Sequence, residues 1–112
     1  MNEIITRNEV LNDGRTIHLY FNGLVGLYVA YGVSAFLLSR LGTVSASYSM
    51  DMQLPVVVLN ATHYEELCRQ VEVLRDVRNY RCLRAMDNMD ETEYAAWAGG
   101  LREEAYKASS MK

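Results

Sequence analysis

Two cysteines and two histidines are the side chains best suited to nucleophilic, acid–base or metal chemistry: Cys68, Cys82, His18 and His63. A nucleophilic cysteine needs a base nearby and a lowered pKa, and a metal site needs ligands at characteristic spacings. The chain has no Cys-x-x-Cys, Glu-x-x-His or His-x-His spacing. Arginines at 81 and 84 flank Cys82 and could favour its thiolate. An enzyme using Cys82 or His63 is therefore our third hypothesis, and we assign no catalytic residue, metal or cofactor.

Motifs for phosphate binding and serine hydrolysis are absent from the sequence. Gly23-x-x-Gly26 lacks the Lys-Ser/Thr pair of a Walker A loop, and the spacing of Gly26 and Gly32 is not the dinucleotide-binding fingerprint. No Gly-x-Ser-x-Gly elbow accompanies the serines near position 47. We interpret these glycines as turn or packing residues.

Arginine is concentrated between residues 69 and 84, a stretch that contains five arginines and two acidic residues. Residues 87–104 contain six acidic residues and one arginine. The two stretches can pair with each other, within one chain or across a dimer. Alternatively the basic stretch binds a small anion, because guanidinium groups suit bidentate contacts with carboxylate or phosphate. The candidate ligand-binding residues are Arg75, Arg78, Arg81 and Arg84.

Tyrosine is over-used, with eight residues in the chain. Tyrosines on an open sheet can stack on nucleic-acid bases, but the neighbouring segments lack basic residues except Arg15. Tyrosine is also enriched at protein–protein interfaces. We therefore predict an interface rather than a nucleic-acid site, and the candidate residues are Tyr20, Tyr28, Tyr31 and Tyr48.

The first half of the chain predicts mostly strands. Residues 3–11 and 15–21 flank Asn12-Asp13-Gly14, a turn sequence typical of hairpins. Asn22-Gly23 is a second turn signal, followed by a strand from 24 to about 33 and a short helix over 34–41, with Ser34 as N-cap and Gly42 after its end. A single helix over 23–41 is the alternative, because short apolar runs fit both patterns.

The segment from Leu19 to Ser39 carries no charge over 21 residues, which is the length of a membrane span. Asn22 and three tyrosines lie within it, and these residues disfavour the centre of a bilayer. We expect no membrane span. The N-terminus also lacks the pattern of a signal peptide, so we expect a cytoplasmic protein.

The second half predicts an edge strand or extended loop over 43–51 and a buried strand over 54–59, which Pro55 should start. Asn60 or Thr62 can cap a helix that runs to about Asp76. A strand over 80–86 follows. Asp90 or Thr92 then begins a last helix to about residue 105, which Gly99-Gly100 could end early.

Together these patterns predict an α+β domain over residues 1–108, with an antiparallel sheet of about four or five strands, two helices packed on one face and a frayed tail at 109–112. The net charge of −3 argues against general nucleic-acid binding. The leading hypothesis is a small non-catalytic protein–protein interaction or regulatory domain that forms a homodimer. The alternative is a module that binds a small ligand or anion through residues 69–84.

Overall fold

The fold is built around one antiparallel sheet, seen in the computed structural model, which describes residues 2–41, 44–85 and 89–110. Along these residues the elements are α1 (Asn2–Val10), β1 (Thr16–Asn22), β2 (Leu27–Tyr31), α2 (Gly32–Ser39), β3 (Ala46–Ser49), β4 (Leu54–Leu59), α3 (Ala61–Gln70), β5 (Val73–Val77), β6 (Tyr80–Arg84) and α4 (Glu91–Ser110). The six strands lie in the order β3-β4-β2-β1-β6-β5, and every neighbouring pair is antiparallel. The predicted α+β class with an antiparallel sheet is confirmed, with six strands rather than four or five.

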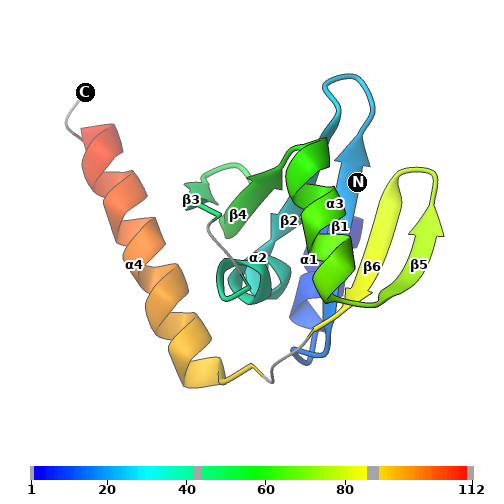
Figure 1. Cartoon of the computed structure of the whole chain (residues 1–112). Helices are drawn as coiled ribbons and strands as arrows, with labels where there is room; N and C mark the ends of the chain where they lie inside the picture. The colour runs from blue at the N-terminus through cyan, green and yellow to red at the C-terminus, as the bar shows by residue number, and fades with distance from the viewer. Residues whose placement is uncertain (1, 42–43, 86–88, 111–112) are drawn as a thin grey trace.

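The core lies on one face of this sheet. Strand alternation places Ile17, Leu19, Val57, Leu59 and Leu83 on that face, and all five are buried. Helix α2 packs directly on β1, β2 and β4, and α3 packs on β2 and β4 (Figure 1). Helix α4 packs against β3, at one edge of the sheet. The buried cluster therefore joins the central strands to helices from both halves of the chain.

The predicted strand over residues 3–11 is wrong, because this segment forms helix α1. Strand β1 is already paired with β2 on one side and β6 on the other, so no edge beside it is free for an N-terminal strand. Helix α1 instead contacts the opposite face of the sheet, where the Asn8 amide donates to the Tyr20 hydroxyl at 2.9 Å. Its Ile5 and Glu9 side chains, one helical turn apart, are buried.

A strand followed by a helix is confirmed for residues 24–41, although residues 24–26 belong to the turn and β2 begins only at Leu27; the alternative of one long helix is wrong. Ser34 is not the N-cap. Tyr31 holds that position and makes no side-chain capping bond. Gly42, the expected residue after the helix, lies outside the described residues. Across the described parts of the chain, no helix is both long and apolar enough to cross a membrane.

Helix α3 begins at the predicted cap, because the Asn60 side chain accepts a hydrogen bond from the backbone N–H of His63 at 2.8 Å. The helix ends at Gln70 rather than near Asp76, and residues 73–77 form a strand that was not predicted. The backbone N–H and C=O groups along one side of this strand bond to β6. The helical pattern of residues 64–74 did not indicate this pairing, because the partner strand comes later in the chain.

The remaining elements lie near their predicted positions, although α4 extends beyond its expected end near residue 105. Strand β3 is an edge strand, and Pro55 lies at the start of β4. The Asp90 carboxylate accepts hydrogen bonds from the backbone N–H groups of Thr92 and Glu93, so Asp90 begins α4. Gly99-Gly100 does not end the helix, which continues to Ser110. Phe36 of α2 meets the Tyr94 and Trp97 rings of α4 at centroid distances of 5.7 and 5.2 Å, and this contact holds α4 on the domain.

Candidate functional site

The four candidate interface tyrosines lie on both faces of the sheet. Tyr20 and Tyr31 share the face that α1 contacts, and their ring centroids are 6.5 Å apart. Tyr28 and Tyr48 lie on the core face, opposite Leu59 and Pro55 of β4. Tyr28 is covered by α3, because its ring stacks on that of Tyr64 at 4.0 Å and 8°. The tyrosines are all half-buried and make contacts within the chain, so they do not form one open surface.

The four candidate arginines also fail to converge. Arg81 lies on the core face with its side chain 14% exposed, pairs with Asp76 at 2.9 Å and approaches the rings of Phe21 and Tyr28. Arg81 therefore completes an aromatic cluster beneath α3. Arg84 lies on the opposite face and pairs with Glu72 at 2.8 Å.

Arg75 and Arg78 are exposed in β5 and in the turn that follows it. Within the described ranges, no ion pair joins the arginines of residues 69–84 to the acids of α4. Glu93 of α4 instead pairs with Arg40 of the turn after α2. The basic and acidic stretches therefore do not neutralise each other inside the described part of one chain.

The strand pairing brings Cys82 opposite His18, a juxtaposition that the sequence did not suggest. The two ring nitrogens of His18 face other groups, since Nδ1 is 2.5 Å from the Tyr80 hydroxyl and Nε2 is 3.5 Å from the Thr16 hydroxyl. Burial lowers the pKa of His18, which keeps the imidazole neutral near pH 7. Cys68 and Cys82 are free thiols. A nucleophile needs a base in hydrogen-bond reach, and both ring nitrogens of His18 lie next to the hydroxyls of Tyr80 and Thr16, with no hydrogen bond to Cys82 among the described residues.

Glu9 is a buried acid, 5% exposed, and it links three elements. Its carboxylate accepts hydrogen bonds from the backbone N–H of Ser34 at 2.9 Å and from the Ser34 hydroxyl at 2.7 Å. The Ser34 hydroxyl oxygen in turn accepts from the backbone N–H of His18 at 2.9 Å. Glu9 thus supplies from α1 the N-terminal cap that α2 lacks in its own sequence. Burial raises the pKa of Glu9 to about 7, although the hydrogen bonds from Ser34 act in the opposite direction. Both carboxylate oxygens are engaged, so we assign Glu9 a structural role.

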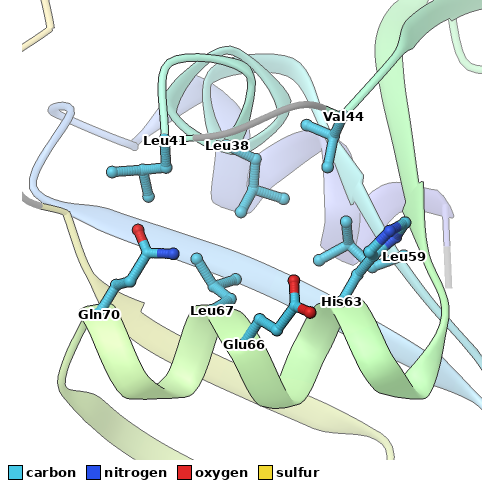
Figure 2. Close-up of a pocket in the computed structure, with 8 residues that line it drawn as sticks. All are labelled: Leu38, Leu41, Val44, Leu59, His63, Glu66, Leu67 and Gln70. Carbon is cyan, nitrogen blue, oxygen red and sulfur yellow. The ribbon is translucent and has the colours of Figure 1, made fainter.

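A cavity of about 180 Å³ lies between α2 and α3. Figure 2 shows Leu38, Leu41 and Val44 on one side of this α2–α3 pocket and the side chains of α3 on the other. Leu59 of β4 and Leu67 of α3 complete an apolar wall, and both are buried. The wall is therefore made by side chains from three different elements.

The rim of the α2–α3 pocket is polar and comes from α3. His63, Glu66 and Gln70 follow one another at helical spacing, so they lie along the same side of the helix as Leu67. All three are exposed, and within the described residues no side-chain hydrogen bond engages them. Of these three residues, only His63 was a candidate from the sequence. The period of the helix could have found Glu66 and Gln70, but the opposite wall comes from distant segments.

The two edges of the sheet differ in what covers them. Helix α4 packs against β3, whereas β5 has β6 on one side and, within the part of the chain that the structure describes, no strand on the other (Figure 1). All five residues of β5 are exposed, and the apolar side chains of Val73, Leu74 and Val77 are 39%, 40% and 47% exposed. The register shifts between Val73 and Arg75, which makes Leu74 the extra residue of a β-bulge.

No family model, curated protein or solved structure matches this chain. The described residues also contain no group of three or more His, Cys, Asp or Glu side chains placed to hold a metal ion. The α2–α3 pocket and the β5 edge are the two surfaces described above that can bind a ligand or a partner.

Proposed function

We propose that this chain is a non-catalytic interaction domain that forms a homodimer by pairing the β5 strands of two copies. The observation that carries the proposal is the difference between the two sheet edges. An edge strand with unpaired backbone groups and exposed apolar side chains is a template for another strand. Val73, Leu74 and Val77 supply such side chains on β5.

The proposed pairing also limits the assembly to two copies. Antiparallel pairing of β5 with β5 of a second copy places a two-fold axis perpendicular to a continuous sheet. The pairing uses the free edge of both copies, and α4 packs against the other edge strand, β3. The β-bulge and the charges of Arg75 and Asp76 limit the length of strand that can pair, which disfavours extended aggregates.

This proposal moves the interface from the tyrosines to β5, because Tyr20 and Tyr28 are engaged by α1 and α3. We further propose that the domain works in the cytoplasm, where its two free thiols stay reduced. The anion-binding alternative has less support, since Arg81 and Arg84 are paired with acids on opposite faces of the sheet.

Sedimentation velocity of the wild-type chain and of the Val77→Lys variant tests the β5 interface. We expect the wild-type chain to be a dimer at about 100 μM. We expect Val77→Lys to weaken dimerisation by about tenfold or more, because both copies of a two-fold dimer would carry the new lysine charge at the interface. Val58→Lys is the matched control, since Val58 is 48% exposed against 47% for Val77 and lies on β4, away from the β5 edge.

Circular dichroism confirms that both variants fold. A wild-type chain that stays monomeric up to about 500 μM would contradict the dimer, because apparent dimerisation has to follow mass action. Equal weakening by Val58→Lys and Val77→Lys would show that the interface is not the β5 edge.

A further inference from the structure

The α2–α3 pocket carries an inference that is independent of the β5 interface. We propose that it binds a small primary amine, whose apolar body fills the cavity and whose ammonium group lies at the rim formed by His63, Glu66 and Gln70. The proposal rests on the volume of the cavity, on its apolar wall and on the chemistry of the three rim side chains.

The size of the cavity limits the apolar body. An engineered apolar cavity of about 150 Å³ accepts benzene, and the α2–α3 pocket measures about 180 Å³. The pocket therefore has room for one ring, or a branched hydrocarbon of that size, and a short arm. Leu38, Leu59 and Leu67 are each at most 7% exposed, so they form a dry wall against which such a body can pack.

The rim decides which polar group completes the ligand. The Glu66 carboxylate and the Gln70 amide carbonyl accept hydrogen bonds, and a neutral His63 has one accepting ring nitrogen. In Figure 2 the side chains of Glu66 and Gln70 rise from α3 toward the wall formed by Leu38 and Leu41. An ammonium group brings three N–H donors and a charge opposite to that of Glu66. A carboxylate in the same place would be repelled by Glu66.

These rim groups are available to a ligand in the described structure. Asn60 accepts from the backbone N–H of His63, which leaves the imidazole itself uncommitted. No ion pair is seen for Glu66 within the ranges described, whereas Glu72, farther along, is paired with Arg84. The pocket thus combines a buried apolar wall with three unengaged polar groups on one side of one helix, which is the usual composition of a small-ligand site.

The test is an NMR titration of the full chain with benzylamine, which is protonated at neutral pH, and with two probes of similar shape, benzyl alcohol and benzoate. We expect benzylamine to shift the amide signals of Leu38, Leu67 and Gln70 in a saturable way, with a Kd on the order of 1 mM for so small a ligand. Benzyl alcohol should bind more weakly, and benzoate weakest. No saturable shift at these residues up to about 10 mM would overturn the site.

Two variants and one matched control assign the recognition to particular side chains. Glu66→Gln should weaken benzylamine binding about fivefold and leave benzyl alcohol unchanged, because only the charge interaction is lost. Glu65→Gln is the control, since Glu65 is the neighbouring exposed acid of α3 and does not line the pocket. Val44→Phe should fill the cavity and abolish binding of all three probes.

Each contrary result overturns a stated part of the proposal. Equal affinity for benzylamine and benzoate, or equal effects of Glu65→Gln and Glu66→Gln, would overturn recognition of the ammonium group. Unchanged binding in a folded Val44→Phe variant would show that the ligand lies outside the pocket. None of these results depends on whether the chain is a dimer.

Discussion

The free energy of unfolding is expected to fall by about 3 kcal/mol as the pH rises from 4.5 to above 7, through the Glu9 carboxyl alone. Burial raises the pKa of Glu9 from an ordinary value of 4.5 to about 7 in the folded chain. Between these two values the folded chain binds a proton that the unfolded chain has released. Stability from this group is therefore largest below pH 4.5 and is lost as the pH approaches and passes the folded-state pKa.

Urea denaturation at pH 5 and pH 8 checks this expectation in the wild-type chain and in Glu9→Gln. The substitution removes the titrating group, so the difference in unfolding free energy between variant and wild type should move by about 2.5 kcal/mol in favour of the variant over that range. Glu3→Gln on the exposed side of α1 is the control and should keep the wild-type pH dependence. A Glu9→Gln variant with an unchanged pH dependence would show that the carboxyl does not titrate in this window.

The second large effect is expected at Gly14, where an alanine should destabilise the domain by about 3 kcal/mol. Gly14 has a φ of +87°, a left-handed conformation that residues with a Cβ adopt at a cost. A Cβ built on Gly14 lies 2.5 Å from the Cβ of Met89 and 3.1 Å from its backbone nitrogen. The backbone strain at Gly14 and the steric overlap with Met89 therefore add, because the loop before β1 lies against a residue just before α4.

Two other glycines separate these contributions. Gly26 has a φ of +67° but open space around its Cβ position, so Gly26→Ala should cost only the conformational part, about 1 kcal/mol. Gly99 lies in the exposed part of α4 with nothing near, and Gly99→Ala should stabilise the domain by about 1 kcal/mol. Thermal and urea unfolding of the three variants measure the series. Equal losses at Gly14 and Gly26 would rule out the contact with Met89.

The secondary structure of a segment could be predicted from the sequence where it depends on residues close to one another in the chain. The alternation of Ile17 and Leu19 with His18 predicted β1, and the Asn60 cap predicted the start of α3. The predicted antiparallel α+β class followed from such patterns. These signals act over a few residues and need no partner from elsewhere in the chain.

The errors occurred where a distant partner overrides local preference. Residues 3–11 resemble a strand, but both sides of β1 are occupied by β2 and β6, and the segment forms α1 on the opposite face. Residues 73–77 continue the apolar period of α3, yet pairing with β6 turns them into an edge strand. Sheet order is a long-range property, and a single sequence does not state it.

The candidate sites depend on long-range structure even more strongly. His63, Glu66, Leu67 and Gln70 are neighbours because α3 is a helix, and the local pattern was sufficient to place them on one side. Packing of α2 and β4 against that helix then formed the pocket, with Leu38 and Leu59 brought from distant positions. The exposure of β5 arose in the same way, from the order of strands and from the position of α4. Local residue patterns thus determined most of the helices and strands. The pocket and the exposed edge were determined by burial and by strand pairing between distant segments, because those contacts form and stabilise only in the folded chain.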